Sequence, residues 1–441
     1  MIFSIDDLVS ELPRLRSTGP FWDTVHERLN AGDMAWAAEL GVALLSAGRG
    51  GASQTSGRLD AAANLISDLS QSAAQGALPV ALRVAATQAA LHPGYEPATA
   101  SALASSPQAP YIEIAYDPAS EFELPGELKA CLTGEMVLRE YQLRASDTIT
   151  AWLDSPAWTT HPLAWLPLQV TDVEAERHLP NYHGHGSSQD LPDGQDVKDA
   201  TSDYATFTGT LPTASNTTTP DTAHRIAAAV QNWADHSNGI IDTGSFHLSG
   251  SISLERLPNL LTSLGLESLA SPDGQPPITI SETTFDRVWE ILFSDASSGC
   301  SYSRGLQGTY GRLATWQAIA ALISSSPETA FDDVSQRAEQ TRWALFAADT
   351  DWFYNFIHDI GIISIDSTRR FPVVVATGFD FGLVGSGVWG LGWVVRIGCC
   401  RWMIVVRFCG CGRRVCRRWR SRVGWGVSAV WCGWCWLRLV G

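Results

Sequence analysis

The stretch IGIISIDSTRRFPVVVA, residues 360–376, contains two short apolar runs on either side of a polar segment. Ile360–Ile365 and Pro372–Ala376 have the length and the β-branched content of strands. The segment between them, DSTRR at 366–370, is polar and suits a turn. Two strands joined so closely predict an antiparallel hairpin. Because helical patterns surround this hairpin, we expect an α+β fold for residues 223–380.

Outward from the hairpin, the rest of residues 223–380 combines helices with one more extended segment. Apolar residues at helical spacing predict helices at 224–233, 257–264, 285–293 and 313–323, and residues 240–252 predict β structure. A further helix is expected to begin near Asp351 and to run through Ile357. We expect Trp316 and Trp352 to lie in the core of this domain.

Residues 1–150 predict a helical domain that is either solenoid-like or bundle-like. Ser4 and Asp7 form a capping-box pattern, Pro20 suits the first turn of a helix, and Asp33 precedes another apolar helical pattern. The exception is YIEIAY at 111–116, whose alternation predicts a single strand. Residues 151–185 form a connecting segment. Residues 186–222 predict a polar linker, because Ser, Thr, Asp, Gly and Pro dominate there.

The charge of the chain changes sign near residue 380. The 441 residues include 30 basic and 46 acidic residues, a net charge of −16. Residues 381–441 contain ten arginines and no lysine or acid, so residues 1–380 have a net charge of 20 − 46 = −26. An acidic surface repels a phosphate backbone, so we expect no nucleic-acid partner. Asp6 and Asp7 stand where a secretory signal would be basic, which predicts a cytoplasmic location.

The segment 381–441 has an aberrant composition. It holds eight of the 18 Trp and seven of the nine Cys, and its other residues are mainly Gly, Val and Arg. G-rich codons specify this set, so we interpret the tail as the product of a shifted reading frame. One alternative is a C-terminal membrane anchor at 381–395, although these 15 residues include five glycines and a span needs ~20 apolar residues. The other alternative is a zinc module around Cys409, Cys411, Cys432 and Cys435.

The best metal-like pattern is His178, His183 and His185, with carboxylates nearby. Three imidazoles and a water can bind zinc. The surrounding residues, PNYHGHG at 180–186, are typical of a loop, and ligands on an unanchored loop are poorly positioned. We therefore favour solvated histidines and expect no metal and no bound cofactor.

The candidate catalytic residues are Asp351, His358 and Arg312. On a helix Asp351 and His358 would share one face, and a carboxylate with an imidazole can perform acid–base chemistry. Asp351 also suits a helix N-terminus, which favours a structural role. The glycines at 305 and 308 precede Arg312 and suggest an anion at a helix start, but no Gly-Lys-Ser/Thr follows. A structural turn is the favoured interpretation of this segment.

Four strings resemble an uncharacterised family of high-GC actinobacteria, a domain of unknown function: HPLAWLPL at 161–168, NWADHSNG at 232–239, GTYGRLATW at 308–316 and DTDWFYN at 349–355. The likeness spans most of residues 120–380. The family's last strand continues into an ATDTD-like end, whereas Ala376-Thr377 is followed here by Gly378, Phe379 and Asp380. This departure places the change of reading frame near residue 378. The resemblance implies no activity.

These observations together predict an acidic cytoplasmic protein that binds another protein. Helical arrays offer extended surfaces, and an immunity-type or regulatory module of this charge would suit a basic partner. The alternative is a hydrolase-like enzyme with Asp351, His358 and Arg312 in one cleft. A membrane is a partner only if the tail is an anchor.

Overall fold

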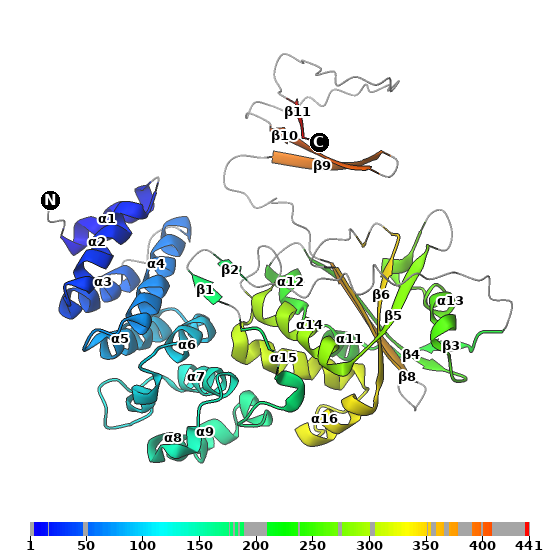
Figure 1. The fold of residues 1–441 in the computed structure, drawn as a ribbon, viewed down its shortest axis with the longest axis horizontal. Coiled ribbons are helices and arrows are strands. Elements are labelled where there is room, and N and C mark those ends of the chain that lie inside the picture. Colours follow the sequence, from blue (N-terminus) through cyan, green and yellow to red (C-terminus); the bar gives the residue numbers. More distant parts are fainter. Residues whose placement is uncertain are drawn as a thin grey trace. The chain divides into compact units, whose positions relative to one another are not determined.

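A computed structural model gives the fold of the protein (Figure 1). It divides into two compact units, Met1–Gly378 and Phe379–Gly441, which are described separately. The structure describes residues 4–15, 17–46, 52–175, 177–179, 181–183, 186–188, 210–236, 239–271, 276–299, 305–350, 352–353, 359–365, 370–377, 390–397, 400–407 and 437–440.

The N-terminal half of the first unit is helical, as expected. Its main helices are α1 (Ile5–Glu11), α2 (Gly19–Asn30), α3 (Met34–Ser46), α4 (Ala52–Gln71), α5 (Ala77–Leu91), α6 (Glu96–Ala104) and α7 (Gly126–Leu138). The Ser4–Asp7 capping box is present, and Pro20 lies in the first turn of α2. The first helices bury one apolar side each, whereas α7 is buried on most of its sides, and all of them contribute to one core.

The strand expected at 111–116 is wrong. These residues belong to the 3₁₀-helix η3 (Ala109–Ala115). Ile112 and Ala115 are both fully buried, which is the spacing of three residues that a 3₁₀-helix places on one side, whereas Tyr111 is 69% exposed. The alternation of apolar residues was too short to separate the two possibilities, and a strand would have needed a neighbouring strand to pair with.

Short elements follow α7. They are α8 (Asp147–Leu153), α9 (Pro156–Thr159), the 3₁₀-helices η5 (Pro162–Trp165) and η6 (Asp172–Glu174), and the paired strands β1 (Asn181–His183) and β2 (Gly186–Ser188). Most of the segment predicted as a linker, 189–209, lies outside the described residues. Its end is regular structure, because Ala214–Asn216 form β3 and α11 (Pro220–Ile226) begins at Pro220.

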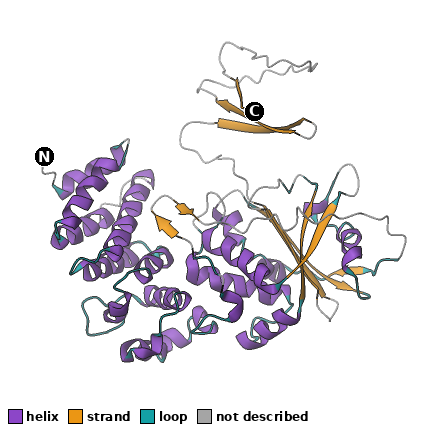
Figure 2. Ribbon diagram, viewed as in Figure 1, coloured by secondary structure: helices purple, strands orange, loops and turns teal. Residues whose placement is uncertain are grey.

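The C-terminal half contains a six-stranded antiparallel sheet with the order β3-β4-β8-β7-β6-β5 (Figure 2). The remaining strands are β4 (Ile240–Leu248), β5 (Ile278–Thr283), β6 (Arg342–Ala348), β7 (Asp359–Ile365) and β8 (Arg370–Thr377). The predicted hairpin is confirmed, with Ile362 opposite Val374. The sheet and its helices also confirm the α+β class.

Helices cover both faces of this sheet. On one side lie α14 (Phe285–Ser298), α15 (Gln307–Leu322) and α16 (Phe331–Gln340), with α12 (Gln231–His236) beside them, and α13 (Leu257–Leu261) lies on the other (Figure 1). One continuous cluster of buried apolar residues runs from the N-terminal helices through α14 and α15 to one sheet face. A second, smaller cluster lies on the other face. The two halves of Met1–Gly378 thus share their larger core.

Of the two tryptophans predicted to lie in the core, Trp316 and Trp352, only the first is fully buried. Trp316 is fully buried on α15, as predicted. Trp352 is only partly buried and lies in a turn, and Phe353 after it is not helical. The predicted helix therefore does not begin at Trp352. Residues 351 and 354–358 lie outside the described residues.

In the second unit the described residues form β9 (Gly390–Ile397), β10 (Cys400–Arg407) and β11 (Leu437–Val440), paired in the order β11-β10-β9. The cysteines of the possible zinc module and residues 381–389 of the possible anchor lie outside the described residues. Within the described part of the chain, we find no helix with the length and apolarity required to cross a bilayer.

Candidate functional site

Arg312 binds a carboxylate, but the carboxylate belongs to its own chain. Its Nε donates to Glu174 Oε1 at 2.6 Å and its Nη2 to Glu174 Oε2 at 2.9 Å. The carbonyls of Pro167 and Gln169 accept two further hydrogen bonds at 3.0 Å. Four bonds occupy most of the five N–H groups of the guanidinium. Arg312 is 2% exposed, and its hydrogen bonds connect α15 to the segment around η6.

The start of α15 also receives a carboxylate from within the protein. Glu135 of α7 is fully buried, and its Oε1 accepts a hydrogen bond of 2.8 Å from the Thr309 backbone N–H. Arg139 donates to the other oxygen at 2.6 Å. A Cβ on Gly308 would lie only 2.8 Å from the Glu135 carboxylate, which explains the glycine there. The glycine-rich start, for which a structural turn was the favoured interpretation and an external anion the alternative, binds Glu135.

Tyr310 completes the contact between the two halves. Its hydroxyl donates to Glu127 Oε1 at 2.6 Å, and His161 Nε2 contacts Glu127 Oε2 at 3.1 Å. His161 Nδ1 accepts the Leu163 N–H at 3.2 Å, so both ring nitrogens have partners. Burial and the bond to Glu127 raise the pKa of Tyr310 above its usual range. Burial alone would raise the pKa of Glu127, but the hydrogen bonds from Tyr310 and His161 outweigh burial, so its pKa lies below the usual value.

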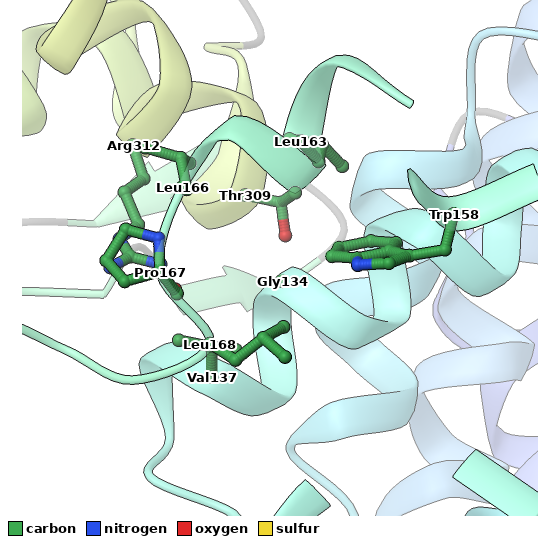
Figure 3. Close-up of a pocket in the computed structure, with 9 residues that line it drawn as sticks. All are labelled: Gly134, Val137, Trp158, Leu163, Leu166, Pro167, Leu168, Thr309 and Arg312. Atoms are coloured by element: carbon green, nitrogen blue, oxygen red, sulfur yellow. The ribbon is translucent and has the colours of Figure 1, made fainter. Parts of the chain in front are cut away.

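A cavity lies beside this junction (Figure 3). Its volume is about 10 Å³, close to the minimum for one water molecule. Trp158, Leu163, Thr309 and Arg312 are among the residues that line it. It is too small for a substrate. The strings HPLAWLPL and GTYGRLATW thus meet at a packed structural junction.

The other predicted site residues are not brought together among the residues that the structure describes. Asp351, His358 and His185 lie outside them, so the Asp351–His358–Arg312 cleft stays a prediction. His183 lies on β1, and the exposed His178 has its Nδ1 3.6 Å from Glu290 Oε1. Within the described ranges, no three His, Cys, Asp or Glu side chains are placed to hold a metal ion.

A second candidate binding site is a polar cleft of about 490 Å³ between α11, β4, the end of α15 and the start of β8. This volume falls in the range of small-molecule sites, roughly 300–1,000 Å³. Its described lining contains three nitrogen-rich side chains, six Ser or Thr residues and one alanine, but no acid. These residues are Thr217, Thr222, Arg225, Ser245, His247, Ala321, Ser324, Ser325, Ser326 and Arg370.

The end of α15 brings two arginines into the cleft. Arg225 of α11 donates to the Ser325 carbonyl at 2.8 Å, and Arg370 of β8 donates to the Ser324 carbonyl at 3.3 Å. These carbonyls belong to adjacent residues, and both arginines line the cleft. Each uses one of its N–H groups on the helix end, which leaves others for a ligand or water. Arg337 of α16 also binds this helix end, at the Ile323 carbonyl and the Ser325 hydroxyl, but does not line the cleft.

One face of β4 forms the floor. Ser245 and His247 lie two residues apart and so point to the same side, away from the core residue Phe246. His247 is paired with Arg370 across the sheet. The Thr217 hydroxyl contacts the Ser245 hydroxyl at 3.2 Å, and Thr222 lies one turn before Arg225 on α11. The cleft therefore has a cationic part and a hydroxyl-rich part.

Ser324 has a strained backbone at this position. Its φ is +56°, in the left-handed region that favours glycine. Ser324 N–H bonds to the Ala321 carbonyl and Ser325 N–H to the Ala320 carbonyl, which is the Schellman arrangement of a helix end. Non-glycine residues in such conformations are concentrated at functional sites. The serine thus places a hydroxyl in the cleft where glycine would be the less strained choice.

Sequence reasoning missed this cleft. Its residues come from four elements between positions 217 and 370, and only the fold brings them together. A weak signal was present in SSS at 324–326, directly after a helix, and in the arginine pair at 369–370 of a chain whose first 380 residues are poor in basic residues.

Comparisons with known proteins support the resemblance found in the sequence. Residues 19–380 match a family of unknown function, DUF6183. Searches of curated proteins and of solved structures return no match. The match covers most of the first compact unit and stops close to its end at Gly378. The chain therefore belongs to DUF6183, a family of unknown function.

Proposed function

We propose that the protein is a cytoplasmic binding module that holds an oxyanion, a phosphate or a sulfate, in the cleft. The observation that supports this proposal most is the convergence of Arg225 and Arg370 on adjacent carbonyls of one helix end. Guanidinium groups with free N–H groups bind phosphate oxygens through charge-assisted hydrogen bonds. The described lining offers no carboxylate to compete for them.

The charge of the cleft differs from that of its surroundings. The remainder of residues 1–380 is strongly acidic, so two arginines facing one cleft are a local exception. Glu328, two residues after Ser326, is exposed, and its carboxylate accepts a hydrogen bond from the Ser326 hydroxyl. This bond is the main reason that the pKa of Glu328 is lowered, with a smaller contribution from Arg225. Glu328 therefore stays charged beside the cleft and is expected to weaken anion binding slightly.

Isothermal titration of the full chain with inorganic phosphate at low salt tests the proposal. A hydrogen bond to a charged group contributes about 1.5–3 kcal/mol, so Arg370→Gln should weaken binding roughly tenfold to a hundredfold. The matched control is Arg337→Gln. This variant loses the hydrogen bonds to the Ile323 carbonyl and the Ser325 hydroxyl at the same helix end, but position 337 does not line the cleft. Its affinity should equal that of the parent protein. No binding to the parent, or an equal loss in both variants, would refute the proposal.

A protein partner is our second proposal. It rests on Tyr111, which is 69% exposed on a segment that also exposes Glu113 and Glu121. Exposed aromatic residues carry much of the binding energy at protein interfaces, and acidic neighbours favour a basic partner. Affinity capture followed by mass spectrometry should identify one basic protein that is retained by Leu91→Ala and lost by Tyr111→Ala. Leu91 is also exposed, at 46%. Equal retention by both variants would exclude Tyr111 as the contact.

A further inference from the structure

The cleft is larger than an oxyanion requires, and this excess points to a second part of the ligand. Its volume is about 490 Å³, whereas a phosphate ion has only five heavy atoms and a water molecule in liquid occupies roughly 30 Å³. The two arginines account for one part of the cleft. If the proposed function holds, the ligand therefore has an additional portion that contacts the remaining lining residues.

Hydroxyl groups dominate that remaining part. Thr222 and Arg225 lie three residues apart on α11, so their Cα atoms are displaced by about 4.5 Å along the helix axis. Ser245 lies two residues from His247 on β4, a displacement of roughly 6.8 Å. Both elements therefore place a hydroxyl-bearing residue next to a nitrogen-rich residue in the lining.

The lining is poorly suited to two other ligand classes. Ala321 is its one apolar residue among those described, which is little to hold an acyl chain. His247 is its one aromatic ring, so it cannot enclose a nucleobase between two rings. Sugar hydroxyls, in contrast, both donate and accept hydrogen bonds, as Ser and Thr hydroxyls do. The Thr217 and Ser245 hydroxyls already lie within 3.2 Å of each other and can receive a ligand hydroxyl together.

From these observations we infer that the cleft binds a phosphorylated sugar or polyol. The phosphate lies between Arg225 and Arg370, and the ligand hydroxyls contact Thr222, Ser245 and Thr217. This inference rests on the proposed oxyanion site and adds the identity of the group attached to the phosphate. No covalent step is involved.

The test compares probes on the full chain by isothermal titration. The probes are inorganic phosphate, glycerol 3-phosphate, ribose 5-phosphate, glucose 6-phosphate, unphosphorylated glucose and adenosine monophosphate. At least one sugar or polyol phosphate should bind tenfold or more tightly than inorganic phosphate, and glucose should not bind measurably. Tighter binding of adenosine monophosphate than of every sugar phosphate would overturn the inference, as would equal affinities for all phosphates.

A double variant separates the two parts of the cleft. Ser245→Ala with Thr222→Val removes two hydroxyls but keeps both arginines, and the backbone N–H of residue 222 still donates to the Thr219 hydroxyl that caps α11. Its affinity for the best sugar phosphate should fall to that of inorganic phosphate, while its affinity for inorganic phosphate stays unchanged. An unchanged sugar-phosphate affinity contradicts the inference alone. Failure of the parent protein to bind any phosphate contradicts the proposed function as well.

Discussion

At the scale of single residues, Glu174 joins α15 to the segment around η6. It is fully buried, it pairs with Arg312, and its Oε1 also accepts the Trp316 indole N–H at 2.8 Å. Its Oε2 accepts the Thr171 backbone N–H at 2.7 Å. A buried ion pair of this kind does not by itself make a protein more stable than an apolar replacement would. Removal of one partner, however, leaves the other charge buried and uncompensated.

We therefore predict that Glu174→Gln lowers the free energy of unfolding by about 3–5 kcal/mol. The control is Glu282→Gln, because the Glu282–Arg342 pair is about half exposed on both sides and should contribute less than ~1 kcal/mol. Urea unfolding of both variants and the parent gives the comparison. Similar losses in the two variants would show that the Arg312–Glu174 pair is not the structural contact described above.

Asp295 provides a pH-dependent test of burial on α14. Burial raises the pKa of its carboxyl well above the usual range, and its Oδ2 has no hydrogen-bond partner among the described residues. An acid whose folded pKa is raised contributes its full stability below the unfolded pKa of about 3.9 and loses it as the pH rises through the folded pKa. The parent protein therefore loses stability with rising pH at this position, whereas a neutral side chain does not.

Accordingly, the stability of Asp295→Asn relative to the parent should increase from pH 4.5 to pH 9. The slope cannot exceed about 1.4 kcal/mol per pH unit for one group. Urea unfolding at four pH values measures it, with the exposed Asp286→Asn on the same helix as the control. A relative stability of Asp295→Asn that is independent of pH would contradict the account of a buried, protonated carboxyl.

Residue identity alone could not assign the role of Arg312. The sequence favoured a structural turn at the start of α15, with an external anion as the alternative, and two carboxylates of the same chain are bound there. Their sources, Glu135 and Glu174, lie 174 and 138 residues from their partners Thr309 and Arg312. Local spacing contains no information on contacts so distant in the chain, so an internal carboxylate and an external ligand could not be distinguished.

At the scale of elements, the end of α15 shows a conflict between stability and binding. Ser324 adopts the left-handed conformation with φ +56° and lines the cleft. We predict that Ser324→Gly raises the free energy of unfolding by about 1 kcal/mol, because glycine adopts this conformation without strain. The same variant should bind phosphate more weakly, because it loses a hydroxyl in the cleft. Thermal melts and titration measure the two effects.

A second variant shows whether the changes in stability and phosphate affinity of Ser324→Gly come from a general change in the helix end. Ala→Gly at position 321 also lies in the cleft lining but removes no polar group, and it should lower stability because glycine is unfavourable within a helix. If Ser324→Gly gains stability and retains full phosphate affinity, the strain has no connection with binding.

The elements differ in how far the sequence could predict them. The hairpin of β7 and β8 followed from two β-branched runs and a polar turn, because such a pattern has few alternatives. The segment at 111–116 was assigned wrongly because six residues cannot distinguish alternation from a 3₁₀ spacing. The cleft could not be predicted at all, since it depends on α11, β4, α15 and β8 meeting in space.

At the scale of the whole molecule, three boundaries nearly coincide. The acidic composition ends at residue 380, the family match ends at 380, and the first compact unit ends at Gly378. We propose that the chain after residue 378 is the product of a shifted reading frame, as its composition indicates. The nucleotide sequence around codon 378, read in the other two frames, tests this directly. A match to the family's continuation in one of them supports the proposal, and its absence in both contradicts it.

We predict that a chain ended after Thr377 is more soluble than the full chain. The segment beyond residue 380 adds eight Trp and seven Cys, and apolar side chains and thiols of this number promote aggregation and oxidation. Soluble yield and thiol titration of both chains provide the comparison. Equal yields without detergent would count against the prediction, and a need for detergent by the full chain alone would favour the anchor.

The central claim is that Arg225 and Arg370 form one anion site, and anomalous X-ray scattering from tungstate tests it most directly. Tungstate has the shape and charge of the oxyanions that the cleft is proposed to bind. Crystals of the full chain should be soaked in tungstate at a concentration near the Kd measured for phosphate. We predict an anomalous peak within hydrogen-bonding distance of both guanidinium groups, and no such peak in Arg370→Gln. A peak at other arginines with an empty cleft would contradict the account.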